Sequence, residues 1–428
     1  MATEKAKRII AAVSIYMLFS YVLAYLSPSR FVFKQPVILT ILVLSYIFAF
    51  SFGAYLGINR QSKREDRIMY PNDTRTGLKV CLIILLGYTI FSMLKNMVAT
   101  GASNLGTALV MSMSNAKDVY YAKGGLDNGP LLNYITILLS PVFVYASLFG
   151  LLRIKSFSNL YKIVYSLFIA FEIFRWMFVG TNKGIFDVVI LLIVGLAFFK
   201  DSDITNKGIN LKKLLIIIAF SFLAIWVFAY TMQSRLGEQY YLIQNVGKYP
   251  LNYNHFLFKL FPDEIVILII RFIDYIVQGY YGLSLGLTLD WKPTFLAGSN
   301  TFLQGYIQPF LSFNVVDRLY QTRIESLFDW GATSNWHTMY LWLANDFSFP
   351  GVVFIMGVIG FLLGECLFDG LEKHNPYGLC LAYLLIKAMF YSSANNQILG
   401  TYSIVTVLFF YLLWKKDKII RFRLRNNF

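Results

Sequence analysis

Long apolar runs alternate with short polar segments along most of the chain, and this pattern predicts helices that cross a membrane. A helix needs about 20 apolar residues to span roughly 30 Å of hydrocarbon. Ten such runs occur: Ile9–Leu26, Val37–Ile58, Leu78–Val98, Leu131–Leu152, Leu160–Val179, Gly184–Phe199, Leu214–Thr231, Phe347–Phe368, Tyr377–Ser393 and Leu399–Trp414. We therefore predict an all-α polytopic membrane protein with about ten spanning helices, in a range of ten to twelve.

One long polar and aromatic segment interrupts this pattern. It divides the chain into an N-terminal bundle (1–231), a large loop (232–346), three C-terminal helices (347–414) and a basic tail (415–428). Within the loop, Glu264–Leu289 is apolar but contains Arg271 and Asp274. Its charges and tyrosines favour helices that lie in or dip into the membrane interface, and a further span is the alternative.

Composition supports the membrane assignment and limits the chemistry. Hydrophobic residues make up 57% of the chain and charged residues 14%, against about a quarter charged in soluble domains. The net charge of +15 is better explained by topology and anionic lipid than by nucleic acid. The cysteines Cys81, Cys366 and Cys380 lie in or beside apolar runs, and the three histidines form no cluster with metal-ligand spacing. We predict no metal and no cofactor.

The distribution of Lys and Arg predicts the orientation, because positive loops stay in the cytoplasm. Alternate loops are rich in positive charge: Arg60, Lys63, Arg64, Arg67, Arg75 and Lys79, then Arg153, Lys155 and Lys162, then Lys200, Lys207, Lys212 and Lys213. The loops between them are poor in charge, and an even number of helices places the basic tail on the same side as the basic N-terminus. We predict that both termini are cytoplasmic and that the 232–346 loop faces outward.

Two charged positions in the N-terminal bundle are candidates for a site. Glu172 and Arg175 share a helical face and are explained by an internal ion pair. Lys183 lies in the outward turn Gly180-Thr181-Asn182-Lys183-Gly184, whose glycines would let the backbone approach an anion. A plain turn with a solvated lysine is the equal alternative.

The outward loop carries arginines that topology does not explain. Arg235, with Glu238 three residues later, begins the loop, and Arg271, Arg318 and Arg323 follow. A single interfacial arginine is explained by snorkelling. Their number favours recognition of a pyrophosphate, because guanidinium binds phosphate oxygens bidentately and keeps its charge.

The end of the loop carries the strongest candidate for proton transfer. His337 follows Trp336 in a polar segment and precedes Asp346 and Phe349-Pro350-Gly351. A histidine near an interface is usually a packing residue, but an outward imidazole can also accept a hydroxyl proton or contact phosphate near neutral pH. His255 and His374 are weaker candidates, because His255 has no charged neighbour nearer than Lys259.

Taken together, this topology resembles the Wzy-type polymerases of O-antigen, capsular and exopolysaccharide repeat units, relatives of the O-antigen ligases in the GT-C glycosyltransferase group. Lys183 takes the place where the family usually has an arginine between small residues, and Arg235 is similar to the arginine that opens the family's large loop. His337, before Asp346 and the Pro-Gly at 350–351, is similar to the ligase segment that places a histidine before a glycine-containing helix start.

The resemblance implies a GT-C-like fold and a metal-independent glycosyl transfer at the outer face of a bacterial cytoplasmic membrane. The partners would be an undecaprenyl-pyrophosphate-linked glycan donor, a lipid-linked acceptor and membrane lipids, with a chain-length regulator and a flippase as candidate partners. His337 and Arg235 would be catalytic, and Lys183, Glu238, Arg271, Arg318, Arg323, Trp336 and Asp346 would bind pyrophosphate or glycan.

Three other functions remain open on the sequence. A lipid-linked oligosaccharide flippase would also need cations facing a cavity, but repeated halves are expected in many transporters and none is visible here. A membrane acyltransferase would need an early catalytic base, and no histidine precedes His255. An O-antigen ligase would share the donor and the mechanism and differ only in its acceptor. The chain has no P-loop or dinucleotide fingerprint, which argues against a nucleotide-driven pump.

Overall fold

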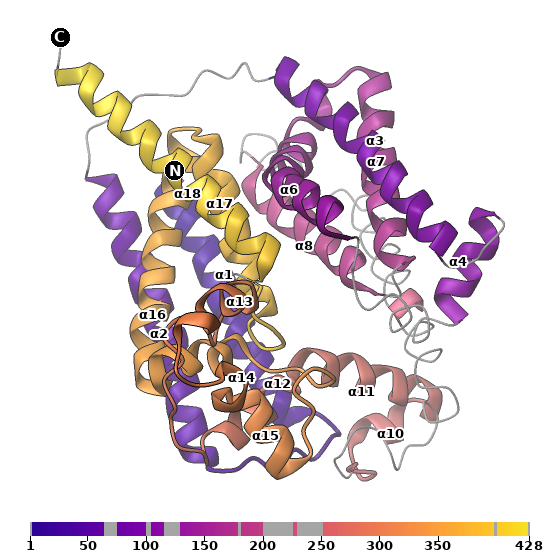
Figure 1. The fold of residues 1–428 in the computed structure, drawn as a ribbon, viewed down its shortest axis with the longest axis vertical. Helices are drawn as coiled ribbons and strands as arrows, with labels where there is room; N and C mark the ends of the chain where they lie inside the picture. The colour runs from indigo at the N-terminus through magenta and orange to yellow at the C-terminus, as the bar shows by residue number, and fades with distance from the viewer. Residues whose placement is uncertain are drawn as a thin grey trace. The chain divides into compact units, whose positions relative to one another are not determined.

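The computed structural model describes residues 2–63, 75–99, 104–114, 129–178, 181–199, 226–228, 251–397 and 400–426. Apart from one isolated antiparallel bridge between Ser29 and Leu251, regular structure in these ranges is helical. Two compact units form (Figure 1): unit 1 combines Met1–Tyr70 with Ile243–Phe428, and unit 2 is Pro71–Leu242. Unit 1 therefore joins the first two helices of the chain to its C-terminal part.

Unit 1 contains long helices and a cap of short ones. The long helices are α1 (Ala2–Leu26), α2 (Pro36–Ser62), α16 (Met339–Glu372), α17 (Pro376–Tyr391) and α18 (Thr401–Asn426). The cap consists of α10 (Phe256–Leu260), α11 (Asp263–Val277), α12 (Gly279–Gly286), α13 (Thr301–Ile307), η5 (Gln308–Phe310), α14 (Val315–Arg318) and α15 (Tyr320–Phe328). The basic tail predicted after Trp414 continues α18 in the same helix.

Among the described helices of unit 1, α2 and α16 make the most extensive contact, and glycines make the close approach possible. A β-carbon on Gly360 would overlap the Phe50 carbonyl oxygen, and one on Gly364 would overlap the carbonyl oxygen of Ala54. The contact advances in the same direction along both helices, so α2 and α16 are parallel. Small residues four apart let backbones pack closely where lipid offers no hydrophobic driving force between helices.

Helix α16 is broken near its start. Ser348 has φ 60° and ψ 165°, which no helix tolerates, and Pro350 lacks the backbone N–H that an uninterrupted helix would use. The hydroxyl of Tyr46 on α2 donates to the Phe349 carbonyl at 3.0 Å, beside the break. The predicted span Phe347–Phe368 therefore corresponds to the part of α16 that follows the break, and Met339–Phe347 forms a separate short helix before it.

The cap of unit 1 is tied to the connection between α1 and α2. The backbone N–H of Asn252 donates to the Pro28 carbonyl at 2.8 Å, and the guanidinium of Arg30 donates to the Asn252 side chain at 3.0 Å. His255 caps α10 by accepting from Leu257 N–H at Nδ1, and its Nε2 lies 3.2 Å from the Leu26 carbonyl. Residues 251–256 are thereby fixed at the end of the first long helix.

Unit 2 is a separate helical bundle. Its helices are α3 (Arg75–Ala99), α4 (Leu105–Ser114), α6 (Gly129–Leu152), η1 (Ile154–Ser156), α7 (Asn159–Met177) and α8 (Lys183–Phe198). Helix α7 packs against α3, α4 and α8, and α6 packs against α3 and α8. Tyr165 of α7 donates to the Ser147 carbonyl of α6 at 3.0 Å, which links these two helices.

Five described helices are long and apolar enough to cross a membrane, and the bent pair α11–α12 would be a sixth. Within the described residues, the prediction of an all-α protein with several helices able to cross a membrane is therefore confirmed. The number of ten spans stays a prediction. Within the predicted seventh run, only residues 226–228 belong to the part of the chain that the structure describes.

Candidate functional site

The elbow between α11 and α12 is the centre of the candidate site in unit 1. The two helices are bent by 45° at Gln278, within the apolar stretch predicted to lie at the interface. A side chain at Gly279 would overlap the Ser393 carbonyl, so this glycine lets the segment after α17 pack directly on the elbow. The same segment after α17 also contacts the start of α16, because the Met339 N–H donates to the Ser392 carbonyl at 2.8 Å. The elbow therefore lies against the segment that leads into α16.

His337 lies in this segment and is neutral. Only 2% of the residue is exposed, and its Nε2 lies 3.2 Å from the Gly331 carbonyl oxygen. A carbonyl only accepts, so Nε2 carries the proton and Nδ1 is the acceptor. Burial lowers the pKa of His337 to about 4, against a smaller opposing effect of the bond to Gly331. A neutral ring can accept a proton but gives no positive charge for a phosphate.

The Nδ1 atom of His337 is buried and has no hydrogen-bond partner within the described residues. It faces the backbone of Gly282 in α12. A β-carbon at that glycine would lie 3.0 Å from Nδ1 and 3.1 Å from Nε1 of Trp330. Glycine at 282 therefore brings an imidazole acceptor and an indole donor against the same short stretch of backbone.

Aromatic rings connect the elbow with the His337 segment. Trp336 packs edge-on against Tyr275 of α11, and Trp330 packs edge-on against Tyr281 of α12, each pair with centroids 5.2 Å apart. Edge-to-face pairs of this kind stabilise packing beyond their buried area. Trp336, predicted as a glycan contact, thus helps to hold His337 beside the elbow.

On another side of α11, a buried carboxylate is held by serines from the connection between α1 and α2. Asp274 accepts from the Ser29 hydroxyl at 2.8 Å and from the Ser27 hydroxyl at 3.4 Å. Arg271 precedes Asp274 by about one helical turn. In the sequence, Asp274 was visible only as a charged residue within an apolar run. That charge was the signal by which a buried carboxylate could have been found.

The two arginines predicted to hold pyrophosphate each contact groups within the cap. Arg318 donates to the Pro293 carbonyl at 3.2 Å and lies over the Phe313 ring at 3.3 Å. Arg323 donates to the Asp290 carbonyl at 2.8 Å and forms an ion pair with the Asp290 carboxylate. These contacts fasten α14 and α15 to the loop before α13.

Asp346, predicted to contact substrate, organises that same loop. Its carboxylate accepts from the Thr294 hydroxyl, from Gly298 N–H at 3.2 Å and from Ser299 N–H at 2.8 Å. Its neighbour Asn345 is fully buried and accepts from Tyr320 N–H at 2.8 Å. The sequence indicated polar residues before a helix start but did not reveal that they hold the cap.

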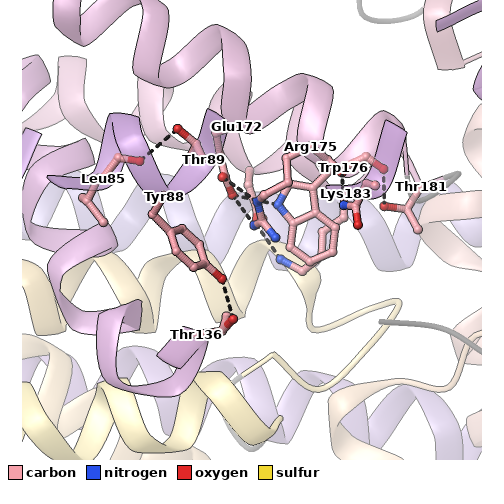
Figure 2. Close-up of polar contacts among 11 residues, drawn as sticks. Leu85, Tyr88, Thr89, Thr136, Glu172, Arg175, Trp176, Thr181 and Lys183 are labelled. Carbon is pink, nitrogen blue, oxygen red and sulfur yellow. Dashed lines mark hydrogen bonds and ion pairs between the residues drawn. The ribbon is translucent and has the colours of Figure 1, made fainter. Parts of the chain in front are cut away.

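A second polar cluster lies in unit 2 around the predicted Lys183 (Figure 2). The expected pair of Glu172 and Arg175 is confirmed, with Arg175 Nη2 at 2.6 Å and Nε at 2.8 Å from the Glu172 carboxylate. Trp176 Nε1 donates to the same carboxylate at 2.9 Å. Lys183 begins α8, pairs with Asp187 at 2.5 Å, and lies 5.0 Å from the Trp176 ring centroid. The two ion pairs, Arg175–Glu172 and Lys183–Asp187, together carry no net charge.

Gly184 makes this arrangement possible, because a β-carbon there would lie 2.7 Å from the Trp176 ring. The glycine was predicted to admit a ligand, and in this structure it admits the indole. The other two predicted residues of the site, Arg235 and Glu238, lie outside the described residues.

Among the residues that the structure describes, no group of three His, Cys, Asp or Glu side chains could hold a metal ion. Comparison with protein-family models, with curated proteins and with solved structures finds no match to this chain.

Proposed function

We propose that this protein polymerises undecaprenyl-pyrophosphate-linked oligosaccharide repeat units at the outer face of the bacterial cytoplasmic membrane. It would be a metal-independent glycosyltransferase of GT-C-like architecture, with both termini cytoplasmic. The observation that carries the proposal is the Nδ1 of His337, which is buried beside Gly282 and has no hydrogen-bond partner among the residues that the structure describes, in a cap joined to long apolar helices. Support also comes from the Lys/Arg asymmetry of the loops and the arginine-rich polar segment.

The transfer needs one proton acceptor and cations for the leaving group. The acceptor sugar hydroxyl attacks the anomeric carbon of the donor glycan, and the bond from that carbon to the pyrophosphate oxygen breaks. The hydroxyl proton passes to Nδ1 of His337, and undecaprenyl pyrophosphate leaves with the bonding electrons. The pyrophosphate is already a good leaving group, so positioning and charge stabilisation supply most of the catalysis.

Arg235 is the proposed pyrophosphate clamp. The contacts of Arg318 and Arg323 with the cap make them better suited to holding the loop around the substrate than to binding the leaving group. The proposal also requires movement. His337 is 2% exposed, so the segment from Trp330 to His337 must move away from the elbow before a sugar hydroxyl reaches Nδ1.

Substitution of His337 tests the assignment. His337→Gln keeps an N–H donor for the Gly331 carbonyl but removes the basic Nδ1, and His255→Gln is the matched control at a helix cap. Cells that depend on this protein for surface polysaccharide should lose polymer with His337→Gln and keep it with His255→Gln. Immunoblotting must show equal amounts of both variants in the membrane. Unchanged chain length and yield in His337→Gln would remove His337 from the mechanism.

Arg235 is tested by a graded pair of substitutions. Arg235→Ala should abolish polymer, and Arg235→Lys should retain part of it, because a lysine keeps the charge but not the bidentate geometry. Equal polymer from Arg235→Ala and the unaltered protein would exclude the clamp.

A further inference from the structure

A tight turn in the cap of unit 1 presents two large apolar side chains outward. Ala297 N–H donates to the Thr294 carbonyl at 3.1 Å, so Phe295 and Leu296 are the central residues of the turn. Both have positive φ, 52° and 69°. Phe295 is 59% exposed and Leu296 is 54% exposed. We name residues 294–297 the apolar turn.

The residues in this turn conflict with its backbone. Positive φ at both central positions is favoured by Asn and Gly and disfavoured by bulky residues. The conformation persists because the carboxylate of Asp346 binds the Thr294 hydroxyl and the amides of Gly298 and Ser299. The chain thus maintains two exposed apolar side chains where polar ones would be easier to accommodate.

The position of Asp346 on α16 gives the turn a depth in the membrane. At the far end of the α2–α16 pair, Arg60 forms an ion pair with Glu365 at 3.3 Å, and 54% of the Arg60 side chain is exposed. An exposed guanidinium marks one boundary of the hydrocarbon. Asp346 lies just before the break at Ser348. The helix that follows, from Phe349 to Glu365, measures about 24 Å at 1.5 Å per residue, most of the roughly 30 Å thickness of the hydrocarbon. The apolar turn is therefore at the opposite boundary.

The part of α16 that follows the break carries an exposed apolar face. Pro350, Phe354 and Val358 lie at four-residue intervals on the part of α16 that follows the break and are exposed, Phe354 by 73%. Four-residue spacing keeps side chains on one helical face. This exposed apolar face begins four residues after Asp346, the residue that anchors the turn.

Basic residues stand beside the turn. Lys292 is exposed, and Phe295 packs on Phe313, whose ring carries the Arg318 guanidinium. Apolar side chains flanked by Lys and Arg suit the boundary between acyl chains and phosphate headgroups.

We propose that the apolar turn inserts Phe295 and Leu296 into the interface of the lipid bilayer and anchors the cap of unit 1 to the membrane. The occupant is lipid, and the anchoring is independent of the proposed glycosyl transfer. It would fix the height of the cap, and with it the elbow and His337, above the hydrocarbon.

Spin labelling of the full chain in lipid nanodiscs tests this proposal. A nitroxide is attached at Leu296→Cys, with Cys81, Cys366 and Cys380 replaced by Ala, and Phe295→Cys is the second labelling site. Glu325→Cys on α15 is the control, because an exposed carboxylate position cannot lie in hydrocarbon. The labels at 296 and 295 should be severalfold more accessible to oxygen than to nickel-EDDA, relative to the control.

Two outcomes would overturn the proposal. Nickel-EDDA access at 295 and 296 equal to that at 325 would place the turn in water. Protection of both labels from both reagents would show that protein covers the turn, either another part of the chain or a second copy, and a dependence on the number of chains per disc would identify the copy.

Discussion

At the scale of single residues, the structure distinguishes predicted site residues that bond within the cap from His337, whose Nδ1 has no partner among the described residues. Asp346, Arg318 and Arg323 bond to backbone or side chains of the cap, whereas Nδ1 of His337 is without a partner in the described part of the chain. Sequence reasoning identified these residues by type and position. It could not distinguish them, because a pattern of polar residues does not reveal which carbonyl or carboxylate each one meets.

Burial of His337 predicts a pH dependence of stability. The unfolded chain binds a proton at the ordinary pKa of 6.5 and the folded chain at about 4. The folded state binds fewer protons between these values, so the stabilising contribution is full above pH 6.5 and declines as the pH falls towards 4. The total loss from this group is about 3 kcal/mol at 1.36 kcal/mol per pKa unit.

Detergent-solubilised protein unfolded at a series of pH values measures this effect. The difference in unfolding free energy between His337→Gln and the unaltered protein should change through the pH 6.5 to 4 window, because the variant lacks the titrating group. A difference that is constant across the window would contradict a buried neutral histidine.

The carboxylate of Asp346 predicts a local effect on the cap. Asp346→Asn removes one acceptor oxygen and the charge while three donors still need it, and hydrogen bonds to a charged group contribute about 1.5–3 kcal/mol each. We expect a stability loss of about 1–3 kcal/mol with faster amide exchange at 294–299. Asp317→Asn, an exposed carboxylate in α14, is the control and should leave exchange at 294–299 unchanged. Equal exchange in the two variants would show that Asp346 does not hold the turn.

At the scale of elements, the contact of α2 with α16 joins the beginning of the chain to its end. The apolar runs predicted both helices, and the spacing of Gly53 with Gly57 and of Gly360 with Gly364 was a visible signal for close packing. The break at Ser348 was not predicted, because the Pro350 signal is compatible with an ordinary helix start. The sequence also left open whether the segment that forms the elbow spans the membrane or lies at its interface, since Glu264–Leu289 combines the length of a span with internal charges.

Two glycine substitutions on α16 test the packing with a matched control. Gly360→Ala places a methyl group on the Phe50 carbonyl, whereas Gly357→Ala places one 3.7 Å from the Ala49 carbonyl, an ordinary contact. Overpacking should reduce stability by about 1–3 kcal/mol in Gly360→Ala. Gly357→Ala should be neutral or stabilise by up to about 1 kcal/mol through helix propensity. Thermal unfolding of both variants in the same detergent gives the comparison, and equal melting temperatures would mean that the α2–α16 contact is looser than described.

At the scale of the whole molecule, hydropathy and charge were sufficient for the class of protein and for an expected orientation. Helices α2 and α16 are parallel, as two spans of even rank in the predicted order would be. The site was harder to predict because its parts come from distant segments. The elbow, the His337 segment and the serines that bind Asp274 are brought together by packing. Lys183 belongs to unit 2, where Asp187 and Trp176 already surround it.

The most direct test of the proposed function is a reaction with purified components. The full chain in lipid nanodiscs is incubated with undecaprenyl-pyrophosphate-linked repeat unit, without metal or nucleotide, and the lipid-linked products are separated by size. We expect a ladder of products with the unaltered protein and none with His337→Gln. Transfer only to a different acceptor would indicate a ligase. No reaction, together with movement of the lipid-linked unit across the membrane of liposomes containing the chain, would indicate a flippase and contradict the proposal.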